Sequence, residues 1–262
     1  NFIVADINKK NFKQIFSKYL NEGDLLIDFA DGVGTKDFVE WCAYNNVMYL
    51  NTGETDWDDN WYNIFEENLK KNKLRNQLRQ NINVNKYPIV LQHGNNPGLV
   101  SHFVKAGLEY IVKKQFKNNK KLNILLEQNK FNELTKELDL KEIHVNDNDN
   151  QEVKDEFDEN KLYSTWSIDS FFFEMLSEAT ANIGTNENID YEKECKKIDF
   201  KNGFLEFKDL AIDKVGKTYY PKGKFEGFLV PHEETITIAK SLEVKNNQDV
   251  IYRPTVMFLY SP

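Results

Sequence analysis

The sequence predicts an α/β fold, in which a parallel sheet that is incomplete at its start is followed by an α+β region. Three short apolar runs in the first hundred residues alternate with segments of helical periodicity. Such an alternation makes the strands parallel and places helices on the faces of the sheet. After residue 117 the alternation is lost, and after Ile198 short strand-like runs dominate. We therefore expect two parts, residues 1–117 and residues 118–262.

The elements of the first part follow from apolar periodicity and turn residues. Residues 25–30 form an apolar run that ends at Asp31, as a buried parallel strand would. Thr35 is suited to cap the helix that follows, because its hydroxyl can accept a hydrogen bond from the first turn. Pro97 stands where a proline favours the start of a helix. The other predicted elements are a strand at residues 47–50, a helix over residues 57–69 and a strand at residues 88–92.

The second part is less regular. Helical periodicity covers residues 122–138, and the run at residues 142–145 predicts a strand. Residues 147–160 are polar and acidic, which is typical of a linker or a surface loop. Residues 166–181 are predicted as one helix with a strongly apolar face. Further strands of a mainly β region are predicted at residues 225–230 and 250–252.

The charge of the chain limits its partners. Lys and Arg number 34 and Asp and Glu number 42 among 262 residues, which gives a formal net charge of −8. Binding to a phosphate backbone needs a surplus of basic residues, so we expect no nucleic-acid partner. A negative charge suits a cationic substrate, and it also serves solubility alone.

The cysteines and the apolar runs indicate a cellular setting. Cys42 and Cys195 lie far apart and outside any CxxC pattern, which favours free thiols in a reducing cytoplasm. No apolar run approaches the roughly 20 residues of a membrane span. The first residues lack the basic and then apolar plan of a signal peptide. The chain opens on Asn1 inside a strand–helix pattern, so we expect it to be a piece of a longer protein.

Several motifs that identify a site are missing from the sequence. There is neither a GxGxxG nor a GxxxxGK motif, so a phosphate-binding glycine loop cannot be argued. The four histidines have no metal-ligand spacing with one another or with the cysteines, and no metal site is expected. No GxSxG motif supports a hydrolase.

Polar residues follow each of the three strands predicted in the first part. They are Asp31, residues 51–54 and residues 95–96. In parallel sheets ligands bind at the carboxyl ends of the strands, so this clustering is consistent with a binding site. Asp, Asn and Gly also make turns, and position alone leaves the two interpretations even.

Four sequence blocks resemble those of homospermidine synthases. His93 to Lys105 reads HGNNPGLVSHFVK and is similar to the family's H-G-A-N-P-G-L-V-S-H-F-V-K, and Thr165 begins TWSID, similar to T-W-S-V-D. Gly227 begins GFLVPHEE, similar to G-F-L-V-T-H-N-E, and Tyr252 begins YRPT, which matches the family's Y-R-P-T. The blocks occur in family order across nearly the whole chain, which makes a chance resemblance improbable although each motif alone is weak.

The resemblance implies a place in the saccharopine-dehydrogenase-like group. Residues 1–117 would be the C-terminal part of a Rossmann-like NAD-binding domain, and residues 118–262 the first part of an α+β substrate and dimerisation domain. Such enzymes oxidise putrescine to an imine, transfer its aminobutyl group to a second amine with release of ammonia, and re-reduce the product with the bound NADH. The resemblance thus implies NAD, putrescine and other small polyamines, and a homodimer.

The resemblance also implies a substrate-binding set. The acidic members would hold ammonium groups, because a diamine is a dication at pH 7. Trp166 would hold an ammonium by a cation–π contact, although core packing is the alternative. Glu174 lies eight residues later, about two helical turns, and thus near the same face. For the acidic position near residue 54, Thr55 competes with Glu54. The set is Asp31, Glu54, Asp147, Trp166 and Glu174.

Catalytic and cofactor roles fall on the first and third blocks. His232 is the candidate proton shuttle, because a reference pKa of about 6.5 allows both protonation states. Glu234 lies two residues later on a predicted strand, so both side chains would point the same way. Asn96 would orient a substrate or cofactor amide, and Pro97 and Gly98 would turn a helix N-terminus toward the cofactor. A structural histidine and a plain helix start are the alternatives.

The chain departs from the family pattern in ways that keep two other functions open. The family's glycine loop is not found, the chain ends earlier than the family does, and the W-G-T-x-E block begins with Ile183 in place of Trp. A carboxyspermidine-type Schiff-base reductase would need a positive residue for the substrate carboxylate, and Arg253 is the candidate. A non-catalytic polyamine-binding remnant is the other alternative.

Overall fold

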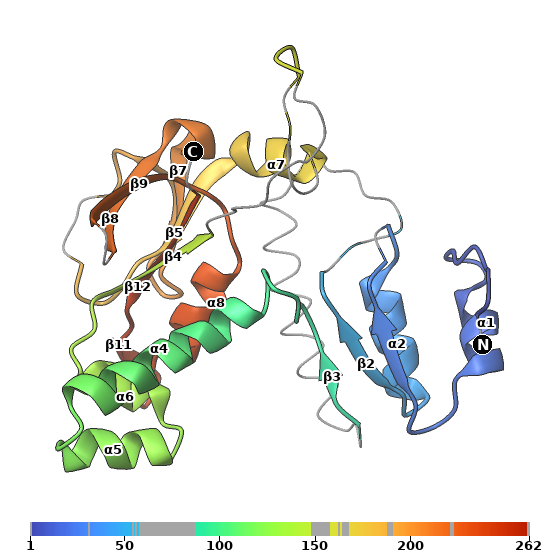
Figure 1. The fold of residues 1–262 in the computed structure, drawn as a ribbon, viewed down its shortest axis with the longest axis horizontal. Coiled ribbons are helices and arrows are strands. Elements are labelled where there is room, and N and C mark those ends of the chain that lie inside the picture. The colour runs from blue at the N-terminus through green and yellow to red at the C-terminus, as the bar shows by residue number, and fades with distance from the viewer. Residues whose placement is uncertain are drawn as a thin grey trace. The chain divides into compact units, whose positions relative to one another are not determined.

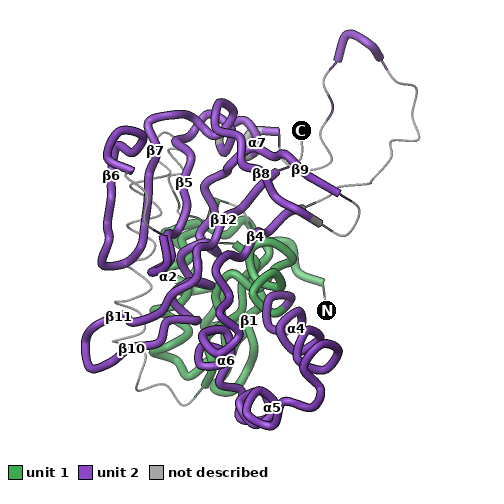
Figure 2. The backbone as a smooth tube through the Cα atoms, turned by 90° about the vertical axis from the view of Figure 1, so that its left-hand side faces the viewer, with its two compact units in different colours: residues 1–102 green, residues 103–262 purple. Residues whose placement is uncertain are grey.

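The chain forms two compact units, residues 1–102 and residues 103–262, which Figure 2 colours separately. Helix α4, Leu99–Gln115, crosses the boundary between them. The functional division after residue 117 stays a prediction. A computed structural model describes residues 2–30, 32–53, 55, 57, 87–147, 158–161, 163, 168–187, 191–220 and 223–260.

Unit 1 contains the predicted parallel sheet. Strands β1 (Leu25–Asp28), β2 (Met48–Asn51) and β3 (Ile89–Val90) lie in the order β1-β2-β3, and both pairs are parallel (Figure 1). Each strand falls within or next to an apolar run that the sequence singled out. The parallel arrangement confirms the expected α/β class.

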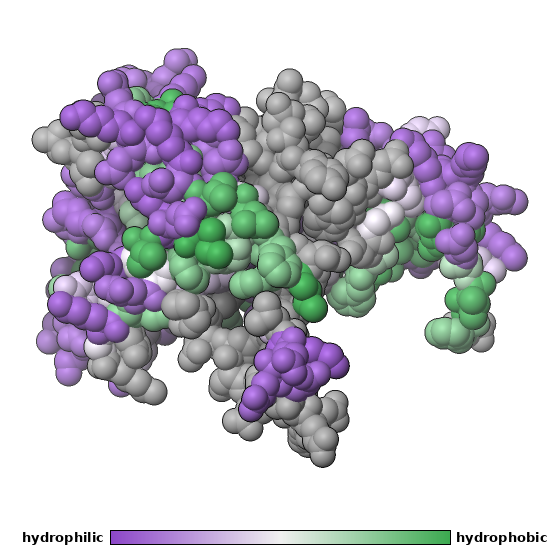
Figure 3. Space-filling view, turned by 90° about the horizontal axis from the view of Figure 1, so that it is seen from above, coloured by the Kyte–Doolittle hydropathy of each residue, from purple (hydrophilic) through white to green (hydrophobic). Residues whose placement is uncertain are grey.

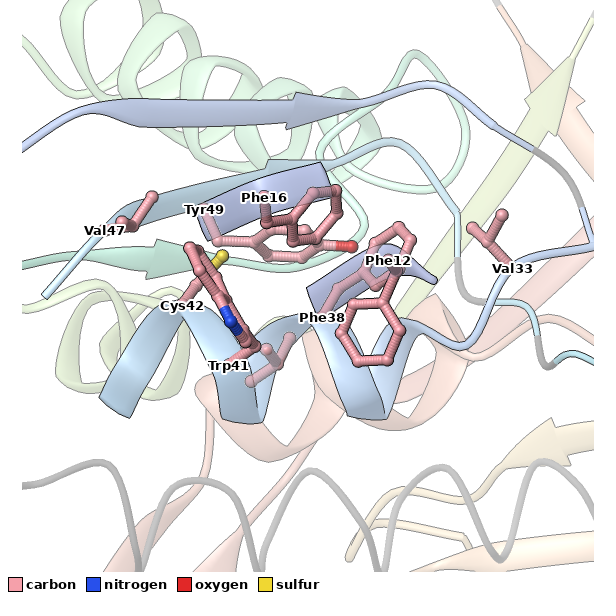
Figure 4. Packing of buried hydrophobic residues seen from close by; sticks show 9 residues of the cluster. Phe12, Phe16, Val33, Phe38, Trp41, Cys42, Val47 and Tyr49 are labelled. Atoms are coloured by element: carbon pink, nitrogen blue, oxygen red, sulfur yellow. The ribbon is translucent and has the colours of Figure 1, made fainter. Parts of the chain in front are cut away.

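Two helices pack on this sheet around an aromatic core. Helix α1 (Phe12–Tyr19) contributes Phe12 and Phe16, and helix α2 (Thr35–Tyr44) contributes Phe38 and Trp41. The rings meet mainly edge to face, for example Phe16 and Trp41 with centroids 5.3 Å apart, a geometry that aromatic quadrupoles favour (Figure 4). Sequence analysis did not anticipate α1.

Two predictions for this unit need comment. Thr35 does not cap α2, because Gly34 is the cap residue and Thr35 is already the first helical residue. Its hydroxyl instead accepts a hydrogen bond from the backbone N–H of Thr55. The predicted helix at residues 57–69 lies outside the described residues beyond Trp57.

The turn between β3 and α4 is tightly closed. The N–H of Gly94 donates to the carbonyl of Pro97 over 2.8 Å, and the N–H of Leu99 donates to the carbonyl of Gly94 over 3.0 Å. Gly98 has a φ of +127°, and a Cβ there would lie 2.7 Å from the Gly94 carbonyl oxygen. Pro97 therefore belongs to the turn, and α4 begins two residues later than the prediction that Pro97 opens it.

The helices of unit 2 enclose a small apolar core. Helix α5 (Lys120–Glu127) begins at Asn119, whose side chain accepts from the N–H of Leu122, and helix α6 (Phe131–Glu137) follows. The helical periodicity expected over residues 122–138 is found, but it is divided between two helices, because Asn129 has a positive φ of 54° and ends the first one. The core residues are Leu108, Val112, Leu122, Leu125 and Leu134.

Among the described residues, unit 2 also holds a seven-stranded mixed sheet with β12 (Thr255–Tyr260) at its centre. β12 pairs in parallel with β4 (Glu142–Asp147) and antiparallel with β5 (Glu178–Asn182) and β9 (Gly223–Leu229). The remaining strands are β6 (Cys195–Asp199) and β7 (Phe204–Leu210) beyond β5, β8 (Val215–Tyr220) beyond β9, and the separate hairpin β10 (Val244–Asn246) and β11 (Asp249–Tyr252).

The predicted helix over residues 166–181 is too long. Helix α7 covers Ile168–Met175, and strand β5 begins at Glu178. Ala179 and Ala181 are buried because they lie in an inner strand, and apolar periodicity does not separate that from a buried helix. Met175 is buried, whereas large apolar side chains of α7 are exposed; Figure 3 shows apolar surface on this unit in green. The exposed ones are Ile168, Phe171 and Phe172, and Leu176, which directly follows the helix, is exposed as well.

Unit 2 contains two further helical elements in its described part. The short 3-10 helix η1 (Ala211–Asp213) joins β7 to β8, and helix α8 (Glu234–Ser241) follows β9. Of the helices in the described part of the chain, none combines the length and apolarity of a membrane span.

We predict that Gly98→Ala lowers the free energy of unfolding by about 1–3 kcal/mol, because a side chain is strained at this φ and meets backbone oxygens. Urea unfolding followed by circular dichroism measures the change. Gly107→Ala is the matched control: Gly107 lies within α4, and a Cβ there meets nothing within 4 Å. The control should be neutral or stabilising by up to about 1 kcal/mol. Equal effects of the two substitutions would contradict the strain at Gly98.

Candidate functional site

The candidate site surrounds His232, which lies in the turn between β9 and α8. Both the N–H and the hydroxyl of Thr235 donate to the carbonyl oxygen of His232, over 3.2 and 2.6 Å, and hold this turn in place. The prediction that His232 and Glu234 share a strand is wrong, because Glu234 is the first residue of α8. The helix start nevertheless turns the two side chains toward each other.

Three elements bring polar groups to the imidazole of His232. From α8, Glu234 Oε2 lies 3.0 Å from Nδ1. From β12, the hydroxyl of Tyr260 lies 3.1 Å from Nε2. From α7, Glu174 Oε1 lies 3.6 Å from Nε2, which is an ion-pair distance rather than that of a good hydrogen bond. Both ring nitrogens of His232 therefore face an oxygen that can share a proton.

The ring of His232 is also held from its face. Phe258 stacks on it with ring centroids 4.1 Å apart and planes inclined by 17°. Phe258 and Tyr260 are two residues apart on β12 and so project from the same face of the strand. One strand thus provides both the apolar support below the imidazole and the hydroxyl at its edge.

The cluster is strongly shielded from water. The side chains of His232, Glu234 and Glu174 are 9%, 3% and 18% exposed. Burial disfavours the imidazolium and by itself lowers the pKa of His232, but Glu174 and Glu234 outweigh burial and raise the pKa from 6.5 to about 10. The two carboxylates therefore favour the imidazolium form of His232 at neutral pH.

The two carboxylate oxygens of Glu174 have different surroundings. Its Oε1 faces His232, whereas its Oε2 is buried and has no hydrogen-bond partner in the described structure. A buried carboxylate oxygen without a donor is costly, and a cation placed there would remove that cost. Glu174 is thus the member of the cluster with remaining capacity for an ammonium group.

The structure brings together three of the residues that the sequence singled out, namely His232, Glu234 and Glu174. It adds Phe258 and Tyr260, which sequence analysis did not identify. Their signal in the sequence is faint: they are two aromatic residues, two positions apart, on a strand that begins at Thr255, the last residue of the YRPT block. Their roles depend on the position of β12 beside the turn that carries His232.

Three predicted substrate-binding residues lie outside the described residues, and a fourth is described by its backbone alone. Asp31, Glu54 and Trp166 lie outside the described residues. Asp147 is the last residue of β4 and pairs with Tyr260 in register, but its side chain is not described. Their roles remain predictions.

The remaining predicted residues lie at the carboxyl ends of the strands in unit 1. Asn96, Pro97 and Gly98 form the closed turn after β3, and each is partly buried. Of the first N–H groups of α4, those of Leu99 and Ser101 donate to backbone carbonyls and so are occupied within the protein.

Asn51, at the end of β2, joins two of these strand ends. Its Oδ1 accepts from the N–H of Gln92, and its backbone carbonyl accepts from the N–H of His93. Its side-chain amide donates to the carbonyl of Gly53. The loops after β2 and β3 therefore form one hydrogen-bonded edge, at the end of the sheet where parallel folds bind ligands.

Comparison with known proteins connects both units to one kind of enzyme. Residues 1–92 match the family profile of the saccharopine dehydrogenase NADP binding domain. The homospermidine synthase of Mesorhizobium japonicum is 24% identical over 281 aligned residues, which include 100% of this chain and 56% of that protein. The chain is similar to homospermidine synthases from end to end. The homospermidine synthase of Blastochloris viridis is 25% identical over 283 aligned residues, which again include 100% of this chain and 56% of that protein.

A solved structure supports the same relationship. The crystal structure of the homospermidine synthase from Legionella pneumophila in complex with NAD matches with a TM-score of 0.78 and 25% identity. The match covers 99% of this chain and 54% of that one. The resemblance seen in the four sequence blocks is thus confirmed. The chain spans about half the length of the homospermidine synthases that it matches.

We predict that stability falls as pH rises from about 6.5 to about 10, because the folded pKa of His232 lies above its unfolded value. The contribution of the imidazolium is complete below pH 6.5 and is lost as pH rises through the folded pKa. Urea unfolding at a series of pH values measures this. His232→Gln removes the titrating group and should flatten this part of the profile. An identical slope in the variant would show that other groups cause it.

Proposed function

We propose that this chain is the part of a homospermidine-forming enzyme that binds polyamine and handles protons. The overall reaction would convert two putrescine molecules into homospermidine and ammonia, without net oxidation. Putrescine is oxidised to an imine, its aminobutyl group passes to a second amine, and the new Schiff base is reduced. The main support is the shielded cluster of His232, Glu234 and Glu174 in a chain similar to homospermidine synthases.

The charge of the cluster suits a diamine. Two carboxylates facing one imidazolium leave the site net negative, and little water is present to screen it. The buried Oε2 of Glu174 would accept a hydrogen bond from an ammonium group. A buried ammonium needs such a partner, because an unpaired one is strongly disfavoured.

Binding of an ammonium would change the proton held by His232. The ammonium and the imidazolium compete for the same carboxylate, Glu174, and like charges close together disfavour each other. The pKa of His232 would fall on binding, and the neutral imidazole could then accept a proton from the amine. This step matters because a hydride leaves the carbon beside a nitrogen only when that amine is neutral.

We propose NAD as the cofactor. The support is the match of residues 1–92 to an NADP binding domain and the NAD bound by the Legionella relative. The hydrogen-bonded edge formed by Asn51 and the turn at Asn96, Pro97 and Gly98 would border it, with Asn96 offering an amide. The sequence contains no glycine-rich phosphate loop, so these residues account for one border of the cofactor and not for its diphosphate. When bound, NAD supplies the acceptor and later the donor of the hydride.

The reductase alternative loses its main candidate residue. A carboxylate-bearing substrate would need an available cation, but the guanidinium of Arg253 makes four hydrogen bonds within the protein. Its Nε donates to the carbonyl of Ile183 over 3.0 Å, and Nη1 lies 3.0 Å from Glu243 Oε1. Nη1 also donates to the carbonyl of Lys201, and Nη2 donates to the carbonyl of Phe200. Arg253 is 4% exposed and therefore acts as a structural clamp.

We predict that Arg253→Lys costs about 3 kcal/mol of stability, because an ammonium cannot make the four hydrogen bonds and leaves Glu243 poorly paired. Thermal and urea unfolding measure the loss. Lys217→Met is the control: this lysine pairs with Glu226 on the surface at 76% exposure and should change stability by less than about 0.5 kcal/mol. An Arg253→Lys protein of normal stability that lost affinity for an amino acid would favour the reductase instead.

The proposed function is tested by mass spectrometry of the products formed from putrescine and NAD. The complete gene product and the 262-residue chain are assayed side by side. Homospermidine from the complete product is the expected result, and its absence from a folded protein would rule out the synthase. Glu174→Gln should weaken putrescine binding by about tenfold or more in calorimetry, because it removes the charge that faces the ammonium.

A surface glutamate provides the control for Glu174. Glu226 lies on β9, is 62% exposed and pairs with Lys217. Glu226→Gln removes the same charge from the chain, but it should leave putrescine affinity unchanged. If both variants bound putrescine equally well, the ammonium site at Glu174 would be wrong.

A further inference from the structure

The two ring nitrogens of His232 have different kinds of neighbours. Nδ1 faces the carboxylate of Glu234 at 3.0 Å, and a carboxylate only accepts. Nε2 faces the phenol of Tyr260 at 3.1 Å, while Glu174 Oε1 stands farther off at 3.6 Å. Glu234 thus favours a proton on Nδ1 in both the charged and the neutral form of the imidazole. The nitrogen that can lose its proton is Nε2, on the side of Tyr260.

A phenol can satisfy Nε2 in both protonation states. When the imidazole is charged, the phenol oxygen accepts from the N–H at Nε2. When the imidazole is neutral, the phenol rotates its O–H and donates to the bare nitrogen. Glu174 cannot donate to the bare nitrogen, because an ionised carboxylate has no proton and its lone pair would face the lone pair of Nε2. Loss of the Tyr260 hydroxyl would therefore disfavour the neutral state most.

Strand β12 fixes the position of this phenol. Tyr260 pairs in register with Phe228 of β9 and Asp147 of β4. Gly227 lets the backbone approach, since a Cβ there would lie 2.5 Å from the carbonyl oxygen of Tyr260. The ring of Tyr260 meets that of Phe258 edge to face with centroids 5.5 Å apart. The hydroxyl is therefore held beside Nε2 by the backbone and by the aromatic contact.

We infer that Tyr260 is a positioning residue, which makes Nε2 of His232 the proton-exchanging nitrogen by giving it a hydrogen bond in both protonation states. The inference deepens the proposed function and rests on it for its role in the reaction. The titratable groups that the described structure places against His232 are Glu174 from α7, Glu234 from α8 and Tyr260 from β12.

The test measures the titration and tautomer of the His232 ring by ¹⁵N and ¹³C NMR in the whole chain, with His232→Gln used to assign its signals. In Tyr260→Phe the midpoint should move to higher pH, with about a threefold smaller neutral fraction at a given pH below the midpoint, the size expected for one neutral hydrogen bond. The variant keeps the ring that contacts Phe258, so folding should be preserved. A midpoint that stayed in place or moved to lower pH would overturn the inference.

Two further variants separate the role of the phenol from that of charge. Glu174→Gln should move the same midpoint to lower pH, because it removes a negative charge that favours the imidazolium. Tyr219→Phe removes a hydroxyl from a tyrosine that is 76% exposed on β8 and should leave the midpoint unchanged. A shift in Tyr219→Phe equal to that in Tyr260→Phe would also overturn the inference.

The complete gene product adds a readout in the reaction. Tyr260→Phe should lower kcat and move the acidic limb of its pH profile to higher pH, whereas KM for putrescine should change little because Glu174 is retained. The NMR titration tests the role of Tyr260 independently of whether homospermidine is formed. Failure of the synthase assay alone therefore overturns the proposed function, and failure of the NMR shift alone overturns the role of Tyr260.

Discussion

The site in unit 2 depends on the pairing of strand β12. One edge of this strand is bonded to β4, and the other edge is shared between β5 and β9. A strand bonded on both edges cannot shift its register without turning its buried face outward. Because Phe258 and Tyr260 share that strand, the support beneath His232 and the hydroxyl at its edge are fixed together. The turn after β9 then brings His232 itself to the same place.

Burial strengthens the electrostatic interaction between His232 and the carboxylates around it. In water the same histidine and carboxylates would interact weakly, but inside unit 2 little solvent screens them. An imidazolium between two carboxylates is stable there, and any additional cation must displace part of its interaction. Under the proposed function, this site would couple the binding of an ammonium group to the release of a proton. Arg253 and Glu243, which are also buried, are a contrasting case, because their hydrogen bonds are all made within the protein.

Much of the architecture could be predicted from local pattern. Apolar runs closed by turn residues located β1, β2 and β3, and their alternation with helices indicated parallel pairing. The failures share a physical cause. Residues 166–181 were predicted as one helix, but the alanines of its last part alternate with Glu178 and Thr180 in an inner strand, and so short an apolar pattern fits a buried helix as well as a buried strand. Residues 122–138 have helical periodicity on both sides of Asn129, whose left-handed backbone is not visible in that pattern.

The sequence by itself determined the α/β class, the likeness to homospermidine synthases and three members of the candidate site, His232, Glu234 and Glu174. Short sequence blocks can be matched to a family from the order and spacing of their residues, and this match singled out the three site residues. Only the tertiary structure decided that Glu234 opens a helix, that Arg253 is engaged within the protein, and that Phe258 and Tyr260 enclose the imidazole. The contacts of Arg253 and Tyr260 join residues that lie from 10 to 70 positions apart along the chain, and no local pattern carries information on which distant elements will meet. The pKa of His232 is decided at the same level, because it depends on burial and on charges from three separate elements.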